Sequence, residues 1–188
     1  MSDQVGWAPP TAEQIYERLL VVRAQAGDET AFAELVERYS PRLRYFLRKL
    51  LASADGAEDA LQDVWLSVFR HLPRLADPQA LVAWLYRIAR DQAFGRLRKL
   101  RKGEQPLDER TVADVPTADE NDFSVEDAAR IHAALDALPP EQREVLVLRF
   151  LEEMTYEQIA SVVGCQLGTV RSRIHYAKQA LKTALGKP

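Results

Sequence analysis

Apolar residues recur along this chain at intervals of three and four, the spacing that gives an α-helix one hydrophobic face. No stretch alternates β-branched with polar residues in the way that predicts a strand. The sequence therefore predicts an all-α fold. Helices are expected over residues 11–27, 28–50, 57–72, 81–102, 125–137, 140–148, 156–163 and 167–185.

Prolines modify this pattern at two places. Ser40 and Pro41 fall inside the second expected helix, where we expect a kink or break because proline cannot donate the helical hydrogen bond. Residues 71–79 contain Pro73 and are expected to form a loop. This loop should end with Asp77 as an N-cap and Pro78 in the first turn of the next helix.

The helical pattern is interrupted over residues 103–123, where the sequence becomes acidic and contains prolines. Such composition is typical of a flexible linker. We therefore expect two small helical domains, the first over 20–102 and the second over 124–188. Residues 1–19 are interpreted as a tail and the start of the first helix.

The net charge of −3 argues against a nucleic-acid-binding protein when it is taken alone. The charges are, however, segregated along the chain. Residues 86–102 contain seven basic residues and one acidic residue, whereas residues 103–130 contain nine acidic and two basic residues. The net charge thus hides a basic block followed by an acidic block. The basic block is available to bind nucleic acid.

Composition and motifs exclude several other classes. The chain has 188 residues and one cysteine, Cys165, so it cannot form an intramolecular disulfide. With no signal peptide and no apolar run long enough to cross a bilayer, we expect a cytoplasmic protein without membrane insertion. Cys165 and His175 have no further ligands at metal-site spacing, and no catalytic motif occurs, so we expect no metal, cofactor or enzyme activity.

The C-terminal part has the pattern of a helix-turn-helix. Thr155 and Gln158 form a capping box, Gly164 ends that helix, and a second helix with a basic outward face follows. In such motifs the second helix enters the major groove. We assign base contacts to Arg171, Ser172 and His175, and phosphate contacts to Thr169, Arg173 and Lys178. The alternative is a basic face that is merely solvated.

Three segments together resemble the signature sequences of extracytoplasmic-function (ECF) sigma factors of the sigma-70 family. They are AEDALQDVWLSVFRHL (57–72), WLYRIARDQAF (84–94) and LPPEQREVLVLRFLEEMTYEQIASVVGCQLGTVRSRIHYAKQAL (138–181). The resemblance covers nearly the whole chain apart from the tail and the linker. It implies a transcription initiation factor that binds core RNA polymerase and promoter DNA, with many relatives also controlled by an anti-sigma factor.

The resemblance also implies roles for residues of the first domain. Polymerase contact falls on Asp59, Gln62 and Asp63, which in isolation also fit a solvated surface. The loop up to Gln79 would receive a flipped base of the minus-ten element. Tyr86 would stack on a base, and the following helix would hold the single strand through Arg87, Arg90, Asp91, Arg96, Arg98 and Lys99.

The chain departs from the family at two positions of this helix. Asp91 stands where an asparagine is usual, and Gly95 stands where an aspartate is common. Two other functions are compatible with parts of the pattern: a helix-turn-helix repressor or activator without polymerase contact, and a sigma-like protein that only titrates a regulator. The basic and aromatic helix after Pro78 favours the sigma factor over both.

Overall fold

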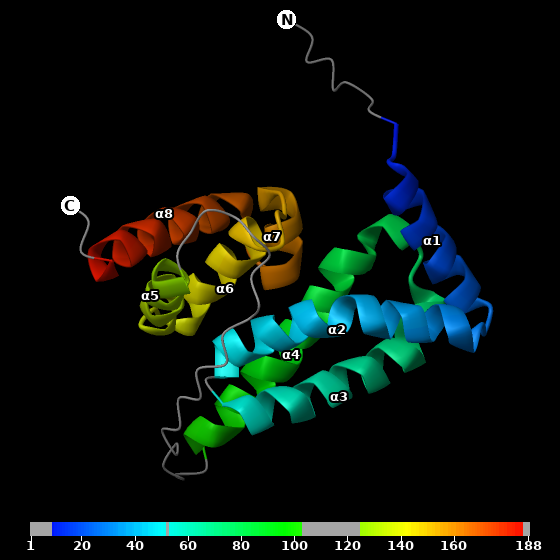
Figure 1. Ribbon diagram of the computed structural model, residues 1–188, viewed down its shortest axis with the longest axis horizontal. Coiled ribbons are helices and arrows are strands. Elements are labelled where there is room, and N and C mark those ends of the chain that lie inside the picture. The colour runs from blue at the N-terminus through cyan, green and yellow to red at the C-terminus, as the bar shows by residue number, and fades with distance from the viewer. Residues whose placement is uncertain (1–8, 52, 103–124, 186–188) are drawn as a thin grey trace, which may run out of the picture.

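The computed structural model describes residues 9–51, 53–102 and 125–185, without the side chains of 101–129. All regular elements of this part are helical, which confirms the all-α prediction (Figure 1). The expected acidic linker lies outside the described residues. The elements are α1 (Ala12–Gln25), α2 (Glu29–Leu51), α3 (Ala54–His71), η1 (Leu72–Arg74), η2 (Pro78–Ala80), α4 (Leu81–Lys102), α5 (Val125–Asp136), α6 (Pro140–Phe150), α7 (Tyr156–Val163) and α8 (Leu167–Ala184).

A kink or break is expected at Ser40 and Pro41; helix α2 is continuous through both residues, so a break is wrong. Tyr39 and Leu43, on either side of the proline, are both fully buried. Ser40 Oγ accepts a hydrogen bond from Trp65 Nε1 of α3 at 3.0 Å. Burial of α2 on both sides of Pro41 offsets the lost backbone hydrogen bond, because packing decides helix continuity more strongly than local propensity.

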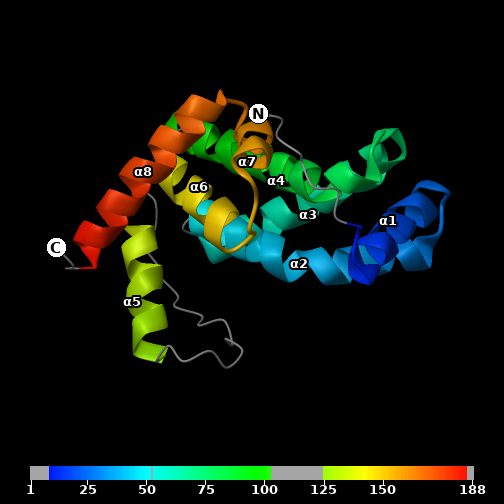
Figure 2. The same cartoon turned by 90° about the horizontal axis from the view of Figure 1, so that it is seen from above.

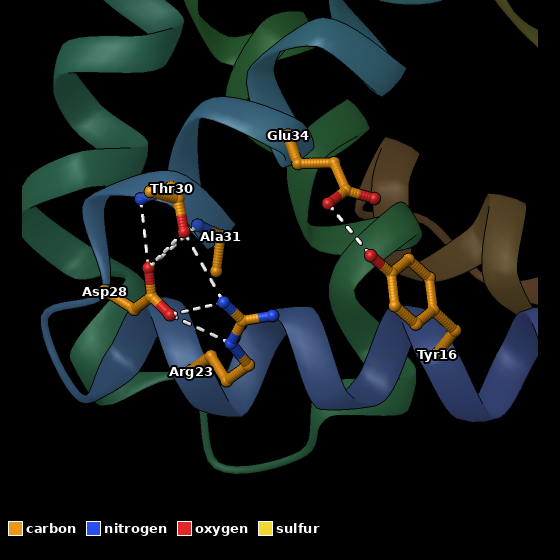
Figure 3. Close-up of polar contacts among 6 residues, drawn as sticks. All are labelled: Tyr16, Arg23, Asp28, Thr30, Ala31 and Glu34. Atoms are coloured by element: carbon orange, nitrogen blue, oxygen red, sulfur yellow. Dashed lines mark hydrogen bonds and ion pairs between the residues drawn. The ribbon is translucent and has the colours of Figure 1, made fainter.

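The corner between α1 and α2 is fixed by Asp28 (Figure 3). Its carboxylate accepts hydrogen bonds from the backbone amides of Thr30 and Ala31 at 3.0 and 3.1 Å, and it pairs with Arg23 at 2.6 Å. The Thr30 hydroxyl, the Ala31 amide and Arg23 together lower the pKa of Asp28 well below its usual range. Asp28 therefore caps α2 and ties it to the end of α1.

Helices α1–α4 form one bundle, here called the N-terminal bundle, and α5–α8 form the C-terminal bundle (Figure 1). The N-terminal bundle packs around α2, with buried residues such as Phe46, Val64 and Leu85 between α2, α3 and α4. In the C-terminal bundle, Leu148 and Ile174 are buried between α6 and α8.

The two bundles pack directly on each other. Helix α7 lies against α4, and α6 lies against the C-terminal half of α2, as the views in Figures 1 and 2 agree. The buried apolar residues of both bundles belong to one continuous cluster. The sequence predicts two domains but gives no indication that they dock.

Candidate nucleic-acid and polymerase interfaces

The C-terminal helix-turn-helix consists of α7 and α8. The Thr155 hydroxyl accepts from the Gln158 amide, while the Gln158 side chain accepts from the Thr155 amide, so the predicted capping box is confirmed. Gly164 ends α7 in the left-handed conformation, with φ at +70°, which glycine adopts without steric cost. The turn then presents α8 with its buried face formed by Val170, Ile174 and Ala177.

Five of the six residues predicted to contact DNA from α8 are exposed: Thr169, Arg171, Ser172, His175 and Lys178. The sixth, Arg173, is half-buried and faces the carboxylate of Glu144 at 3.6 Å. The Lys178 ammonium lies over the Phe150 ring at 4.9 Å, at the edge of this surface. Tyr176 is 59% exposed on the same helix, a residue that the sequence did not single out.

The five basic residues of α4 that the sequence predicts to contact DNA divide into two groups. Arg87, Arg98 and Lys99 are exposed, as is Asp91, and the three cations form what we call the basic track. Arg90 and Arg96 are instead partly buried, and each is paired with a carboxylate. Arg90 Nε donates to Glu144 of α6 at 2.8 Å. Arg96 Nη2 donates to Asp63 at 2.5 Å, and its Nη1 lies 3.7 Å from Asp59.

Tyr86 does not lie on the nucleic-acid face, so its predicted stacking on a base is wrong for this arrangement. The side chain is fully buried, with its ring edge-on to Phe46 at 5.2 Å. Burial, followed by the nearby Glu152 carboxylate, raises the pKa of Tyr86 far above its usual range. The helical position of Tyr86 directs its ring between α4 and α2, a direction that depends on where the neighbouring helices pack.

An open cavity of about 420 Å³ lies beside the loop that the sequence assigns to a flipped base. It is called the loop cavity here, and it is lined by Ser67, His71, Arg74, Leu75, Ala76, Trp84 and Ile88. His71 Nδ1 lies 2.8 Å from the Ser67 carbonyl, which can only accept, so Nδ1 carries the proton. Gln79 is exposed in η2, with its amide held by Asp77 at 2.9 Å.

The residues predicted to contact polymerase lie together on α3. Gln62 is exposed, the side chains of Asp59 and Asp63 are 68% and 46% exposed, and Asp63 is held by Arg96. Leu66 and Phe69 follow at helical spacing and are 55% and 66% exposed. These five residues are called the α3 stripe. Leu66 and Phe69 were missed, although their spacing from Asp59 and Gln62 could have placed them on the same face.

Comparison with known proteins identifies the family to which the chain belongs. The sequence model described as Sigma-70 region 2 matches residues 35–103, and that described as Sigma-70, region 4 matches residues 121–181. An RNA polymerase sigma-H factor from Pseudomonas aeruginosa is 33% identical over 93% of this chain and 95% of its own length. The chain belongs to the sigma-70 family, in its ECF group. An ECF sigma-E factor from Escherichia coli K12 is 29% identical over 90% of this chain and 94% of its own.

Solved structures agree with this assignment. A sigma factor RpoE from Bartonella quintana, in complex with the anti-sigma factor NepR, is 26% identical with a TM-score of 0.70, covering 82% of this chain and 96% of its own. CnrH, in complex with the cytosolic domain of CnrY, is 25% identical with a TM-score of 0.66, covering 90% and 97%.

Sigma factors are non-enzymatic transcription initiation factors, and this sigma factor acts in promoter-specific initiation. Recognition of minus-ten and minus-thirty-five elements is typical of its two matched regions. Within the described residues, no helix is long and apolar enough to cross a membrane. No cluster of three or more His, Cys, Asp or Glu that could bind a metal ion occurs in that part of the chain.

Proposed function

We propose that this sigma factor binds core RNA polymerase through the α3 stripe and reads promoter DNA through α4, the loop cavity and α8. The observation that carries this proposal is the exposure of separate surfaces on the two bundles. The basic track lies on the N-terminal bundle, and the DNA-facing side of α8 lies on the C-terminal bundle. A protein with a single DNA-binding module would need only one of these two surfaces.

Helix α8 has the side chains needed to read the minus-thirty-five element in the major groove. Arg171 can donate two hydrogen bonds to a guanine edge, while Ser172 and His175 suit neighbouring base edges. Thr169, Arg173 and Lys178 are assigned to phosphates. For Arg173 this role requires that its guanidinium leave Glu144, which it faces at 3.6 Å.

The minus-ten element is assigned to the loop cavity and the basic track. A base that leaves the duplex needs a concave site with a stacking surface and polar groups at its edge. The Trp84 ring and Ile88 supply apolar surface at the loop cavity, and His71 and Arg74 supply polar groups. The basic track would hold the single-stranded backbone, while Gln79 and Asp91, which carry no positive charge, would contact bases rather than phosphates.

The α3 stripe combines acidic and exposed apolar side chains, which suits a protein partner better than water alone. We assign it to core polymerase. As a sigma factor the protein is expected to have no catalytic activity of its own and to work in the cytoplasm. The solved complex of RpoE with the anti-sigma factor NepR supports an anti-sigma factor as a further partner.

Run-off transcription with purified core polymerase on a promoter library tests the proposal. We expect transcripts only when this protein is added, from templates that share two motifs at fixed spacing. If the protein binds duplex DNA but neither binds core polymerase nor supports run-off transcription, it is a helix-turn-helix regulator instead.

A further inference from the structure

The outward face of α8 contains one large apolar side chain that the proposed function does not use. Tyr176 is 59% exposed, whereas the other exposed side chains of α8 are polar, charged or small. We propose that Tyr176 is a specificity residue whose ring packs on the C5-methyl group of one thymine in the minus-thirty-five element. This inference rests on the proposed binding of α8 to that element.

Tyr176 lies among the residues of α8 that are assigned to DNA. It follows Ser172 by four residues and Arg173 by three, and side chains at these spacings are neighbours on the surface of an α-helix. Thr169 lies a further turn back on the same side. A duplex that contacts Thr169, Ser172 and Arg173 therefore lies against the ring of Tyr176 as well.

The ring of Tyr176 is paired with the ring of His175. The two ring centroids are 5.5 Å apart, and the ring planes meet at 76°. An edge-to-face contact is favourable for aromatic rings and restricts the orientations that each can adopt. Because His175 is itself assigned to a base edge, the paired ring of Tyr176 is expected beside the same base pair or the next one.

A methyl group is the feature of the major groove that an exposed ring can distinguish. Thymine alone among the four bases presents a C5-methyl group there, and apolar side chains recognise it by contact. The other groups on the base edges are hydrogen-bond donors and acceptors, which suit polar side chains such as Arg171 and Ser172. A ring placed over those groups would remove water without replacing its hydrogen bonds. The Tyr176 ring therefore favours a thymine over the other three bases.

The hydroxyl group of Tyr176 gives the same side chain a second contact. Within the described residues this hydroxyl makes no hydrogen bond, so it can donate to a phosphate oxygen at the edge of the groove. A phosphate contact does not depend on the base sequence, whereas the ring contact does. The two parts of the side chain can therefore be separated by substitution.

The test removes only the methyl group. Deoxyuridine lacks the methyl group of thymidine but keeps every hydrogen bond of the base pair. A minus-thirty-five element is first selected from a promoter library with the full-length protein and core polymerase, and each of its thymines is then replaced in turn by deoxyuridine. At one position we expect the replacement to weaken binding about fourfold, the effect of one buried carbon group.

Variants of Tyr176 assign this loss to its ring. In Tyr176→Ala, thymine and deoxyuridine templates should bind equally at that position. Tyr176→Phe should retain the wild-type ratio, while any loss of the phosphate contact weakens both templates alike. Gln179→Ala is the matched control and should also retain the ratio, since Gln179 is exposed on the same helix, three residues further on, with no assigned role. All three changes are at exposed positions and should leave the fold intact.

Two results overturn the proposal. In the first, no thymine of the element responds to the loss of its methyl group in the wild-type protein. In the second, the response persists in Tyr176→Ala, which shows that another group contacts the methyl.

Failure of the proposed function is seen separately. If run-off transcription succeeds but either overturning result is found, the role of Tyr176 falls and the promoter function stands. If transcription fails, the promoter function falls, and the same panel is measured on duplexes selected with the full-length protein alone. Loss of the thymine preference in Tyr176→Ala on those duplexes would still establish recognition of the methyl group.

Discussion

The two helices proposed to bind DNA, α4 and α8, use their basic residues differently. On α8, Arg173 alone among the predicted cations faces an internal carboxylate, whereas on α4 both Arg90 and Arg96 do. Yet α4 belongs to the more basic stretch of sequence. A high density of arginine along the chain is therefore not the same as positive surface, because acidic groups from neighbouring helices neutralise part of it.

The aromatic residues of the two helices show the same contrast. Tyr86 of α4 is fully buried between helices, whereas Tyr176 of α8 is 59% exposed. Helix α4 lies inside a layered arrangement, with α2 and α3 on one side and α7 on another. Helix α8 lies at the outer edge of the molecule (Figure 1). The following predictions test this contrast, beginning with the largest effect.

Substitutions of Tyr86 and Tyr176 should differ most in their effect on stability. Tyr86→Ala removes a buried ring and is expected to cost ~3–5 kcal/mol of unfolding free energy. Tyr176→Ala, its exposed counterpart, should change stability by ~0.5 kcal/mol or less. Chemical denaturation measures both, with Tyr86→Phe as the control that keeps the ring. A stable Tyr86→Ala variant with impaired DNA binding would instead return Tyr86 to the nucleic-acid face.

Substitutions in the α3 stripe should affect the binding of core polymerase alone. Asp59→Lys with Asp63→Lys places like charges against a basic partner and should weaken core polymerase binding at least ~30-fold. Glu37→Lys is the control for charge reversal, since Glu37 is exposed on α2 rather than on α3. Co-purification measures binding.

The same double variant also removes both partners of Arg96. Asp63→Asn, which removes charge without reversing it, separates this effect from the polymerase contact. The isolated C-terminal bundle is not affected by either change, so its DNA preference should stay constant. Wild-type polymerase affinity in a folded double variant would remove these residues from the interface.

Within α8, substitution of a base-reading residue and substitution of a phosphate-contacting residue should have different effects on DNA binding. Arg171→Ala is expected to cost ~1–3 kcal/mol on the cognate upstream element and to relax preference at one position. Lys178→Ala should weaken all sequences about equally and reduce the salt dependence of binding. A binding panel of single-base variants at several salt concentrations measures both. Equal profiles for the two variants would contradict the division of roles.

The smallest expected effect is on the pH dependence of docking. Burial, with Lys49 nearby, lowers the pKa of His132, while Asp136 opposes this shift and Tyr45 contacts the ring. A lowered pKa means that the docked state prefers neutral His132. As pH falls through the ordinary histidine value near ~6.5, the separated state gains the proton first and docking weakens.

Energy transfer between one dye on each bundle of the full-length protein, measured between pH 7.5 and 6, tests this sign, with His132→Gln as the comparison. The wild-type protein should lose more transfer than His132→Gln over this interval. Glu144 does not reverse the result, because its raised pKa acts in both proteins alike. An identical pH profile for the two proteins would show that His132 does not report docking.

Local patterns determined much of this protein. The helical periodicity, the capping boxes at Thr11 and Thr155, the Asp28 cap and the Gly164 turn all follow from neighbouring residues. The family could be identified for the same reason, since its signature segments are continuous in sequence. Exposure of Arg171, Ser172 and His175 on α8 also follows from helical spacing, because that helix has one covered face.

Tertiary structure alone decided the rest. The continuity of α2 through Pro41, the burial of Tyr86, and the pairing of Arg96 with Asp63 depend on which helices pack together. Arg90 and Glu144 are 54 residues apart in the chain and meet only because the two bundles dock. Periodicity places a side chain on a face of its helix, but the partner that covers that face comes from a distant part of the sequence. Which charges remain free for DNA or polymerase is therefore a property of the packed molecule.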